Sequence, residues 1–249
     1  MKHVNTVGGF LLLTAAVTAQ AQVVNLNNYD NFAVTQFTPY VGPGAYPGAT
    51  SGDFWNGFGL ESSGSNPYPA TGLLSDSTGT PTGMSYSITY DFNNGADSSS
   101  YQGTPAFLYA ETAAVSGTDV GTLTLNNVPT GSYNLYLYGA NFDGTRGAQF
   151  TVSSGAALGG ISATTNPYTS AGSGPLTTFA LGVDYVEFTG VTADGSGNIN
   201  ITWTQNVHDN SGGGEGDFNG MSLVAVPEPG TLALLGLGLA GFVTRRRRS

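Results

Sequence analysis

The stretch GTLTLNNVPTGSYNLYLYGANF, residues 121–142, alternates apolar and polar side chains on both sides of a turn. Before the turn, threonine separates Leu123 from Leu125, and after it leucine alternates with tyrosine. A period of two is typical of a strand with one buried face, and Asn-Asn-Val-Pro-Thr-Gly is rich in turn-forming residues. The stretch therefore predicts an antiparallel β-hairpin.

The same alternation recurs along the chain. MSYSITYD, residues 84–91, and NINITWT, residues 198–204, each place apolar side chains on one face. Further strands are predicted at residues 32–37, 106–110, 121–125, 133–139, 149–153, 183–188 and 221–225. About ten strands with no helical periodicity between them predict an all-β fold, a single β-sandwich or jelly roll over residues 22–225.

The hairpin turn also carries a resemblance. Its Leu-x-x-x-Pro-x-Gly-x-Tyr spacing, from Leu125 to Tyr133, resembles a hairpin of galactose-binding-like and malectin-like jelly rolls. The resemblance covers residues 121–142 only. It implies a jelly-roll fold and is carried no further.

The charges are distributed unevenly. The chain has 6 Lys and Arg against 16 Asp and Glu, and Arg146 is the only basic residue between the two ends. An acidic body repels nucleic acid and anionic lipid, so we expect a solvated acidic surface and no nucleic-acid partner. The absence of cysteine excludes disulfides, thiolate metal sites and a cysteine nucleophile.

The first 21 residues have the pattern of an export signal. Lys2 precedes an apolar stretch, and Ala19 and Ala21 stand in the small-x-small arrangement that signal peptidase accepts. We expect cleavage after Ala21, which makes Gln22 the first residue of the exported protein.

Carboxylate pairs suggest one kind of catalysis, glycoside hydrolysis. Asp184 with Glu187, or Glu215 with Asp217, would need to face each other across a cleft. Acidic residues are frequent enough in this chain to form such pairs by chance. His208 is the one histidine after the signal, and no Gly-x-Ser-x-Gly motif accompanies it. We therefore expect a protein that is not an enzyme.

Two Gly-rich stretches, residues 39–82 and 205–218, are predicted to be long loops, and each contains a candidate binding site. In HDNSGGGEGDFNG, residues 208–220, a calcium site is predicted at Asp209, Glu215 and Asp217, because calcium prefers carboxylate and amide oxygens on a flexible loop. The spacing differs from that of an EF-hand, and the alternative is a loop without a metal.

The second candidate site is an aromatic platform for a sugar. GDFWNGFG, residues 52–59, offers Asp53, Trp55 and Asn56, and an exposed ring beside amide and carboxylate groups is what sugar recognition requires. The alternative is that Trp55 closes the end of the core. Trp203, on an alternating strand, is predicted to be a core residue.

The last 24 residues, VPEPGTLALLGLGLAGFVTRRRRS, combine three features. Residues 231–243 carry no charge, but these 13 residues would form a helix only about 20 Å long, shorter than the roughly 30 Å hydrocarbon core. Length alone permits a buried helix. The four following residues, Arg245, Arg246, Arg247 and Arg248, favour a short membrane anchor held by cytoplasmic positive charge, with the body outside.

The order of these features resembles the PEP-CTERM sorting signal, also catalogued as an ice-binding protein C-terminal domain. Val226, Pro227, Glu228 and Pro229 form the motif, followed by the Gly- and Leu-rich segment and the arginine cluster. The resemblance, over residues 226–249, implies recognition by exosortase, cleavage near Pro-Glu-Pro and delivery to the cell surface or an exopolysaccharide matrix. The body has no regular Thr-x-Thr ladder, so ice binding is not expected of it.

These observations predict an exported protein with a structural or adhesive role, anchored for a time in the inner membrane. Its expected partners are signal peptidase, exosortase, the membrane and a surface polysaccharide. The alternative is a carbohydrate-binding module that uses the platform around Trp55.

Overall fold

The computed structural model describes residues 22–28, 40–58, 68–95, 108–109, 111–140, 146–154, 158–165, 178–205 and 214–227. The predicted signal peptide, the predicted strand at residues 32–37, and the tail from Glu228 onward lie outside these residues. Within the described residues, no helix is long and apolar enough to cross a membrane.

The described residues form fourteen strands in three sheets. The five-stranded sheet has the spatial order β11 (Tyr185–Val191), β8 (Ser132–Tyr138), β14 (Gly220–Val226), β1 (Val23–Asn28), β2 (Asn56–Phe58). The six-stranded sheet has the order β10 (Leu158–Thr164), β9 (Ala148–Ser154), β12 (Ile199–Gln205), β7 (Gly121–Asn126), β4 (Pro81–Tyr90), β3 (Tyr68–Ser75). The small sheet consists of β13 (Glu215–Phe218), β6 (Glu111–Ser116), β5 (Phe92–Gly95).

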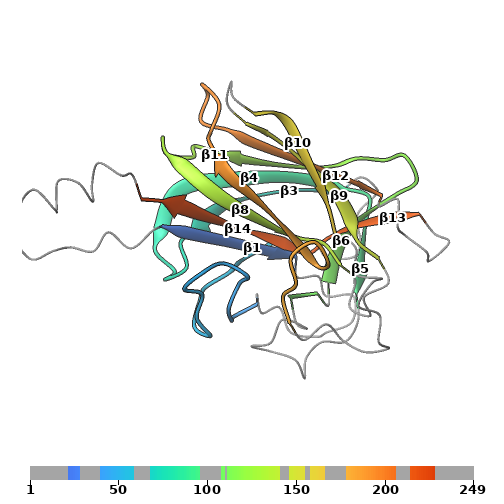
Figure 1. Ribbon diagram of the computed structural model, residues 1–249, viewed down its shortest axis with the longest axis horizontal. Helices are drawn as coiled ribbons and strands as arrows, with labels where there is room; N and C mark the ends of the chain where they lie inside the picture. The colour runs from blue at the N-terminus through green and yellow to red at the C-terminus, as the bar shows by residue number, and fades with distance from the viewer. Residues whose placement is uncertain are drawn as a thin grey trace, which may run out of the picture.

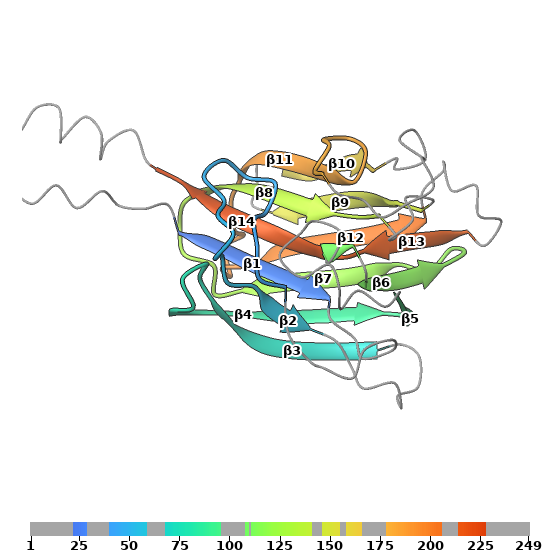
Figure 2. The same cartoon turned by 90° about the horizontal axis from the view of Figure 1, so that it is seen from below.

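The two large sheets pack as a sandwich around one apolar core, and Figures 1 and 2 show their strands running alongside each other. The core takes side chains from both sheets, such as Leu26 of β1 and Ile88 of β4. Near its centre the Trp203 and Phe218 rings lie 4.9 Å apart, and Trp203 Nε1 donates to the Ala113 carbonyl over 3.2 Å. The prediction that Trp203 is a core residue is confirmed, since its side chain is fully buried.

A second cluster covers the outer face of the five-stranded sheet. Leu135 and Leu137 of β8 point into the sandwich, and the alternate residues Tyr136 and Tyr138 point into the second cluster. Their partners there are Tyr40, Tyr46, Trp55, Leu108, Tyr109 and Ala140. The Tyr138 hydroxyl accepts a hydrogen bond from the Ala45 amide over 2.8 Å, so the ring is buried without losing a partner for its polar end. Strand β8 is therefore buried on both faces.

The prediction of an all-β sandwich is confirmed. Seven predicted strands correspond to β4, β7, β8, β9, β11, β12 and β14. The predicted hairpin is β7 and β8, but these strands lie in different sheets, so they do not pair with each other. In the turn between them Asn127 has a φ of 54°, a left-handed conformation that asparagine tolerates better than most residues.

Three local predictions are wrong. Residues 39–82 are not one long loop, because β2 and β3 lie within them and β4 begins at Pro81. Residues 205–218 likewise include β13. The predicted strand at 106–110 is displaced, since β6 begins at Glu111. Its residues Thr112, Ala113, Ala114 and Val115 are all buried, and this continuous burial leaves no alternation in the sequence.

The packing of β7 against β12 gives a first prediction. Gly121 lies opposite Trp203, and a Cβ at position 121 would overlap the indole ring. We expect Gly121→Ala to lower the free energy of unfolding by about 1–3 kcal/mol, the usual cost of overfilling a core. Urea unfolding followed by circular dichroism measures this change.

Gly52→Ala is the matched control, because a Cβ at Gly52 has no atom within 4 Å. It should change stability by less than about 0.5 kcal/mol. Equal losses in the two variants would contradict the proposed packing.

Candidate functional site

The candidate site is the end of the sandwich at which β1 begins and β14 ends. We call it the exit end, and it lies at the left of Figure 1. Val23 pairs with Val224, and the Ala225 amide donates to the Gln22 carbonyl over 2.9 Å. Gln22 follows the predicted signal cleavage point, and Val226 begins the predicted sorting motif. The pairing of β1 with β14 therefore brings the two predicted processing points together.

Strand β14 holds its position through both neighbours. It pairs with β1 on one side and with β8 on the other, where its last rung joins Val226 to Ser132. Leu223 is buried in the core, whereas Val226 is 39% exposed. Pro227 has no amide hydrogen to donate to a further rung. The predicted motif thus starts at the last residue of β14 that pairs in the sheet, and no linker lies between the sheet and the motif.

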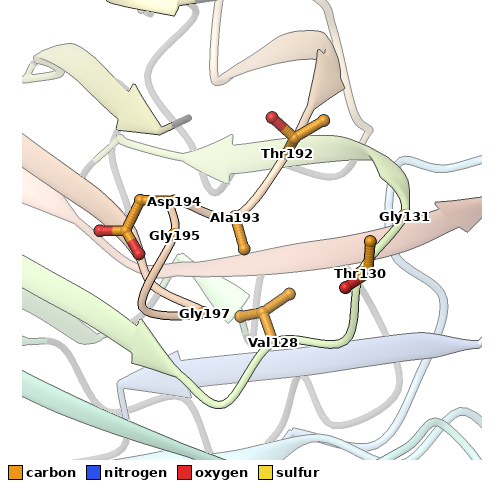
Figure 3. A pocket seen from close by; sticks show the side chains of 8 residues that line it. All are labelled: Val128, Thr130, Gly131, Thr192, Ala193, Asp194, Gly195 and Gly197. Atoms are coloured by element: carbon orange, nitrogen blue, oxygen red, sulfur yellow. The ribbon is translucent and has the colours of Figure 1, made fainter. Parts of the chain in front are cut away.

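Two loops at the exit end border an open pocket of about 410 Å³. Figure 3 shows Val128 and Thr130, from the loop between β7 and β8, opposite Ala193 and Asp194, from the loop between β11 and β12. The Asp194 Oδ1 atom accepts hydrogen bonds from the Ser196 and Asn198 amides, each over 2.8 Å. This carboxylate therefore stabilises its own loop.

The predicted sugar platform is wrong in one essential respect, because Trp55 is fully buried. Its ring packs edge-on against Tyr40, with 5.2 Å between ring centroids, and its Nε1 donates to the Gly42 carbonyl over 2.9 Å. A sugar stacks on a ring face that solvent reaches, and this ring has none. The alternative, that Trp55 closes the end of the core, is right that the ring is a packing residue, but the ring lies in the second cluster, outside the core between the two large sheets.

Asp53 and Asn56 are each 8% exposed, and both hold the backbone together. Asp53 accepts hydrogen bonds from the Thr50 hydroxyl over 2.6 Å and from the Tyr46 hydroxyl. Asn56 Nδ2 donates to the carbonyls of Asn25 and Ser75, and Oδ1 accepts from the Ser75 amide, each over 2.8 Å. Asn56 thus links β1, β2 and β3.

The residues of the predicted calcium site have different surroundings. The Glu215 carboxylate forms an ion pair with Arg146, and Asp217 is fully buried. Asp209 lies outside the described residues. Within the described part of the chain, no three His, Cys, Asp or Glu side chains gather as metal ligands would. The calcium site at Asp209, Glu215 and Asp217 stays a prediction.

In the candidate catalytic pair of Asp184 and Glu187, each carboxylate accepts a hydrogen bond from within the protein. Asp184 is buried beside the start of β11, where Oδ1 accepts from the Ala180 amide over 2.7 Å. Glu187 accepts a hydrogen bond from the Tyr136 hydroxyl over 3.0 Å. Burial raises the pKa of Asp184 to about 6, although the Ala180 amide opposes the shift.

Asn56 gives a second prediction. Asn56→Ala removes the partners of three backbone groups, and we expect a loss of roughly 2–3 kcal/mol in the free energy of unfolding. Asn200→Ala is the control, since the Asn200 side chain accepts one hydrogen bond, from the Thr124 hydroxyl on a partly exposed face, and should cost less than about 1 kcal/mol. Chemical denaturation of both variants tests the difference. A smaller loss for Asn56→Ala than for Asn200→Ala would contradict the linking role.

Asp184 gives a third prediction, on pH. Because its folded pKa lies above the ordinary value of 3.8, Asp184 favours folding most in acid, and this contribution is lost as the pH rises through about 6. Asp184→Asn keeps an acceptor for the Ala180 amide without the charge. We expect the free energy of unfolding of the variant to be roughly 2 kcal/mol higher than that of the wild type at pH 7 and equal to it near pH 4. Urea unfolding across this range would contradict the prediction if the difference did not change with pH.

Comparison with known proteins identifies the tail. Residues 225–248 match the PEP-CTERM protein-sorting motif. No curated protein matches the chain in sequence.

Among solved structures, the chain is similar to that of the plant receptor-like kinase FER, with 17% identity and a TM-score of 0.38 over 83% of this chain and 42% of that one. For TmCBM61 in complex with β-1,4-galactotriose, identity is 14% and the TM-score 0.22, over 55% of this chain and 77% of that one. For an exo-β-1,3-galactanase from Phanerochaete chrysosporium with galactose, identity is 22% and the TM-score 0.26, over 61% of this chain and 36% of that one. The chain thus spans less than half of the kinase and galactanase structures, and none of these likenesses is close enough to carry an argument about binding. The motif, by contrast, implies an exported protein that is anchored in the membrane before exosortase sorts it to the cell surface.

Proposed function

We propose that this protein is a non-enzymatic structural or adhesive component of the cell surface or of an exopolysaccharide matrix. Signal peptidase cuts after Ala21, the short apolar segment anchors the body on the outer side of the inner membrane, and exosortase cuts near Pro227, Glu228 and Pro229. The arginine cluster at 245–248 is discarded with the anchor. The body then remains at the surface as a folded sandwich.

One observation carries this proposal, namely that the sorting motif begins where the β14 ladder ends. The last rung is Val226 with Ser132, and the buried core residue nearest the tail is Leu223. A cut after Pro227 therefore removes none of the fourteen described strands and no side chain of the two described apolar clusters. We therefore expect the fold to tolerate loss of the whole tail, as a removable sorting signal requires.

The composition of the body suits a fold that is stable without disulfides and that resists self-association. The chain contains no cysteine, and Arg146 is the one basic residue between its two ends. A fold that depends on its apolar core for stability needs no oxidising compartment, and its excess of carboxylates limits self-association. Contact with a surface polysaccharide belongs to this proposal as a partner, but Trp55 contributes no platform to it.

The tail gives a fourth prediction. Replacement of Pro227, Glu228 and Pro229 by alanine should cause the full-length protein to accumulate in the membrane fraction, because exosortase loses its recognition motif while the anchor remains. Intact-mass spectrometry of the membrane and surface fractions measures the result. The wild-type surface form should begin at Gln22 and lack Arg245, Arg246, Arg247 and Arg248.

Gly52→Ala, on an exposed turn of the body, serves as the control and should be processed as the wild type is. A wild-type surface form that keeps its arginines would disprove the proposed processing. Normal processing of the triple-alanine variant would show that Pro-Glu-Pro is not the recognition motif.

A further inference from the structure

The exit end must lie close to the membrane while the tail is uncut, an inference that rests on the proposed function. Three residues, Glu228, Pro229 and Gly230, lie between Pro227 and Thr231, where the apolar run begins, so the span is four residue-to-residue steps. An extended chain covers at most about 3.6 Å per residue, so the tether is no longer than about 14 Å. Strand β4 alone has ten residues and extends about 33 Å away from the exit end. One end of the body therefore faces the bilayer, and the other end is held away from it.

The exit end carries exposed apolar side chains. Phe54 is 38% exposed and Val41 47% exposed, and an antiparallel bridge places them opposite each other. The Phe54 amide donates to the Ser77 carbonyl over 2.8 Å, and the Ser77 amide donates to the Val23 carbonyl over 2.7 Å. These bonds fix Phe54 beside the start of β1. Val226, 39% exposed, stands at the end of the neighbouring strand β14.

The carboxylates near these apolar side chains are engaged within their own turns. Asp76 Oδ1 accepts from the Thr78 hydroxyl over 2.6 Å and from the Thr80 amide over 3.0 Å. Arg146 lies at the opposite end, since it precedes β9 at Ala148, which pairs with Gln205 at the far end of β12. Apart from the α-amino group that signal cleavage leaves on Gln22, the described part of the exit end thus offers no cation to an anionic headgroup, and we expect its contact with lipid to be mainly apolar.

We propose that Phe54 and Val41 contact the bilayer interface while the protein is anchored. The short tether brings Pro227 to within about 14 Å of the apolar segment, and a phenylalanine ring at the same end of the body gains free energy when it enters the headgroup region. The contact orients the body upright and holds the residues around Pro227 at the membrane surface, where a membrane-embedded protease acts. It ends when the tail is cut, because Phe54, Val41 and Val226 expose too little apolar surface to hold the body on lipid alone.

The test uses the full chain, with its tail uncut, in phosphatidylcholine vesicles. Phe54→Trp places a fluorophore at the exit end, and Val120→Trp places one at the opposite end, where Val120 is 51% exposed just before β7. Wild-type emission from Trp55 and Trp203 is subtracted. In vesicles of brominated phosphatidylcholine we expect the added emission of Phe54→Trp to fall by roughly half, since interfacial side chains enter about 5–10 Å into the lipid. The added emission of Val120→Trp should not change in the same vesicles.

Val41→Trp is a second reporter, in case tryptophan at position 54 disturbs the fold, and it should be quenched as Phe54→Trp is. The quenching should persist at high salt, because it does not depend on charge. Vesicle flotation, measured on the same samples, distinguishes membrane anchoring by the tail from lipid contact at the exit end. A chain that floats without quenching at either exit-end position would overturn the lipid contact and leave the anchoring intact. A chain that does not float would disprove the anchored intermediate and the contact with it.

Discussion

The pairing of the first strand with the last is the constraint on which the rest of the structure depends. Strand β1 follows the predicted signal cleavage point, β14 precedes the sorting motif, and the two lie side by side within the five-stranded sheet. Without β14, the β11–β8 pair would be separated from β1 and β2, and Leu26 and Leu223 would lose their places in the core. Such a sheet can close only once β14, the last strand along the chain, is available to pair with β1 and β8.

Apolar and aromatic packing carries the stability of this sheet. The chain has no cysteine, and the ion pair of Arg146 with Glu215 involves the only basic residue between its ends. Both faces of β8 are buried, by leucines toward the sandwich and by tyrosines toward the second cluster. Because the second cluster covers what would otherwise be an open sheet face, side chains that look suited to binding are used to hold the segment at residues 40–58 in place. Asp53, Trp55 and Asn56 all belong to this segment.

The fold and the sorting signal fit together at the exit end. The sheet brings Gln22 and Val226 to one end, and a few residues join that end to the apolar segment. In the proposed pathway the exit end of the body faces the membrane during processing. The opposite end faces away from the membrane and is accessible to other molecules. The fourteen described strands include no residue of the predicted signal or anchor, so these strands are the same in the anchored and the final form of the proposed pathway.

The sequence by itself determined the strands with one buried face and the identity of the tail. In β4, β7 and β12 every second side chain enters the core, so the alternation is visible locally, and the tail is recognised from the order of Pro-Glu-Pro, apolar run and arginines. Only the tertiary structure decided the burial of Trp55, the meeting of the two chain ends and the strands β1, β2, β3, β5, β6, β10 and β13. Strand β1 contains three asparagines, Asn25, Asn27 and Asn28, which disfavour a strand locally. They form one because β14 and β2 supply backbone partners, and the partner in β14 lies nearly two hundred residues away in the chain, beyond the reach of any local pattern.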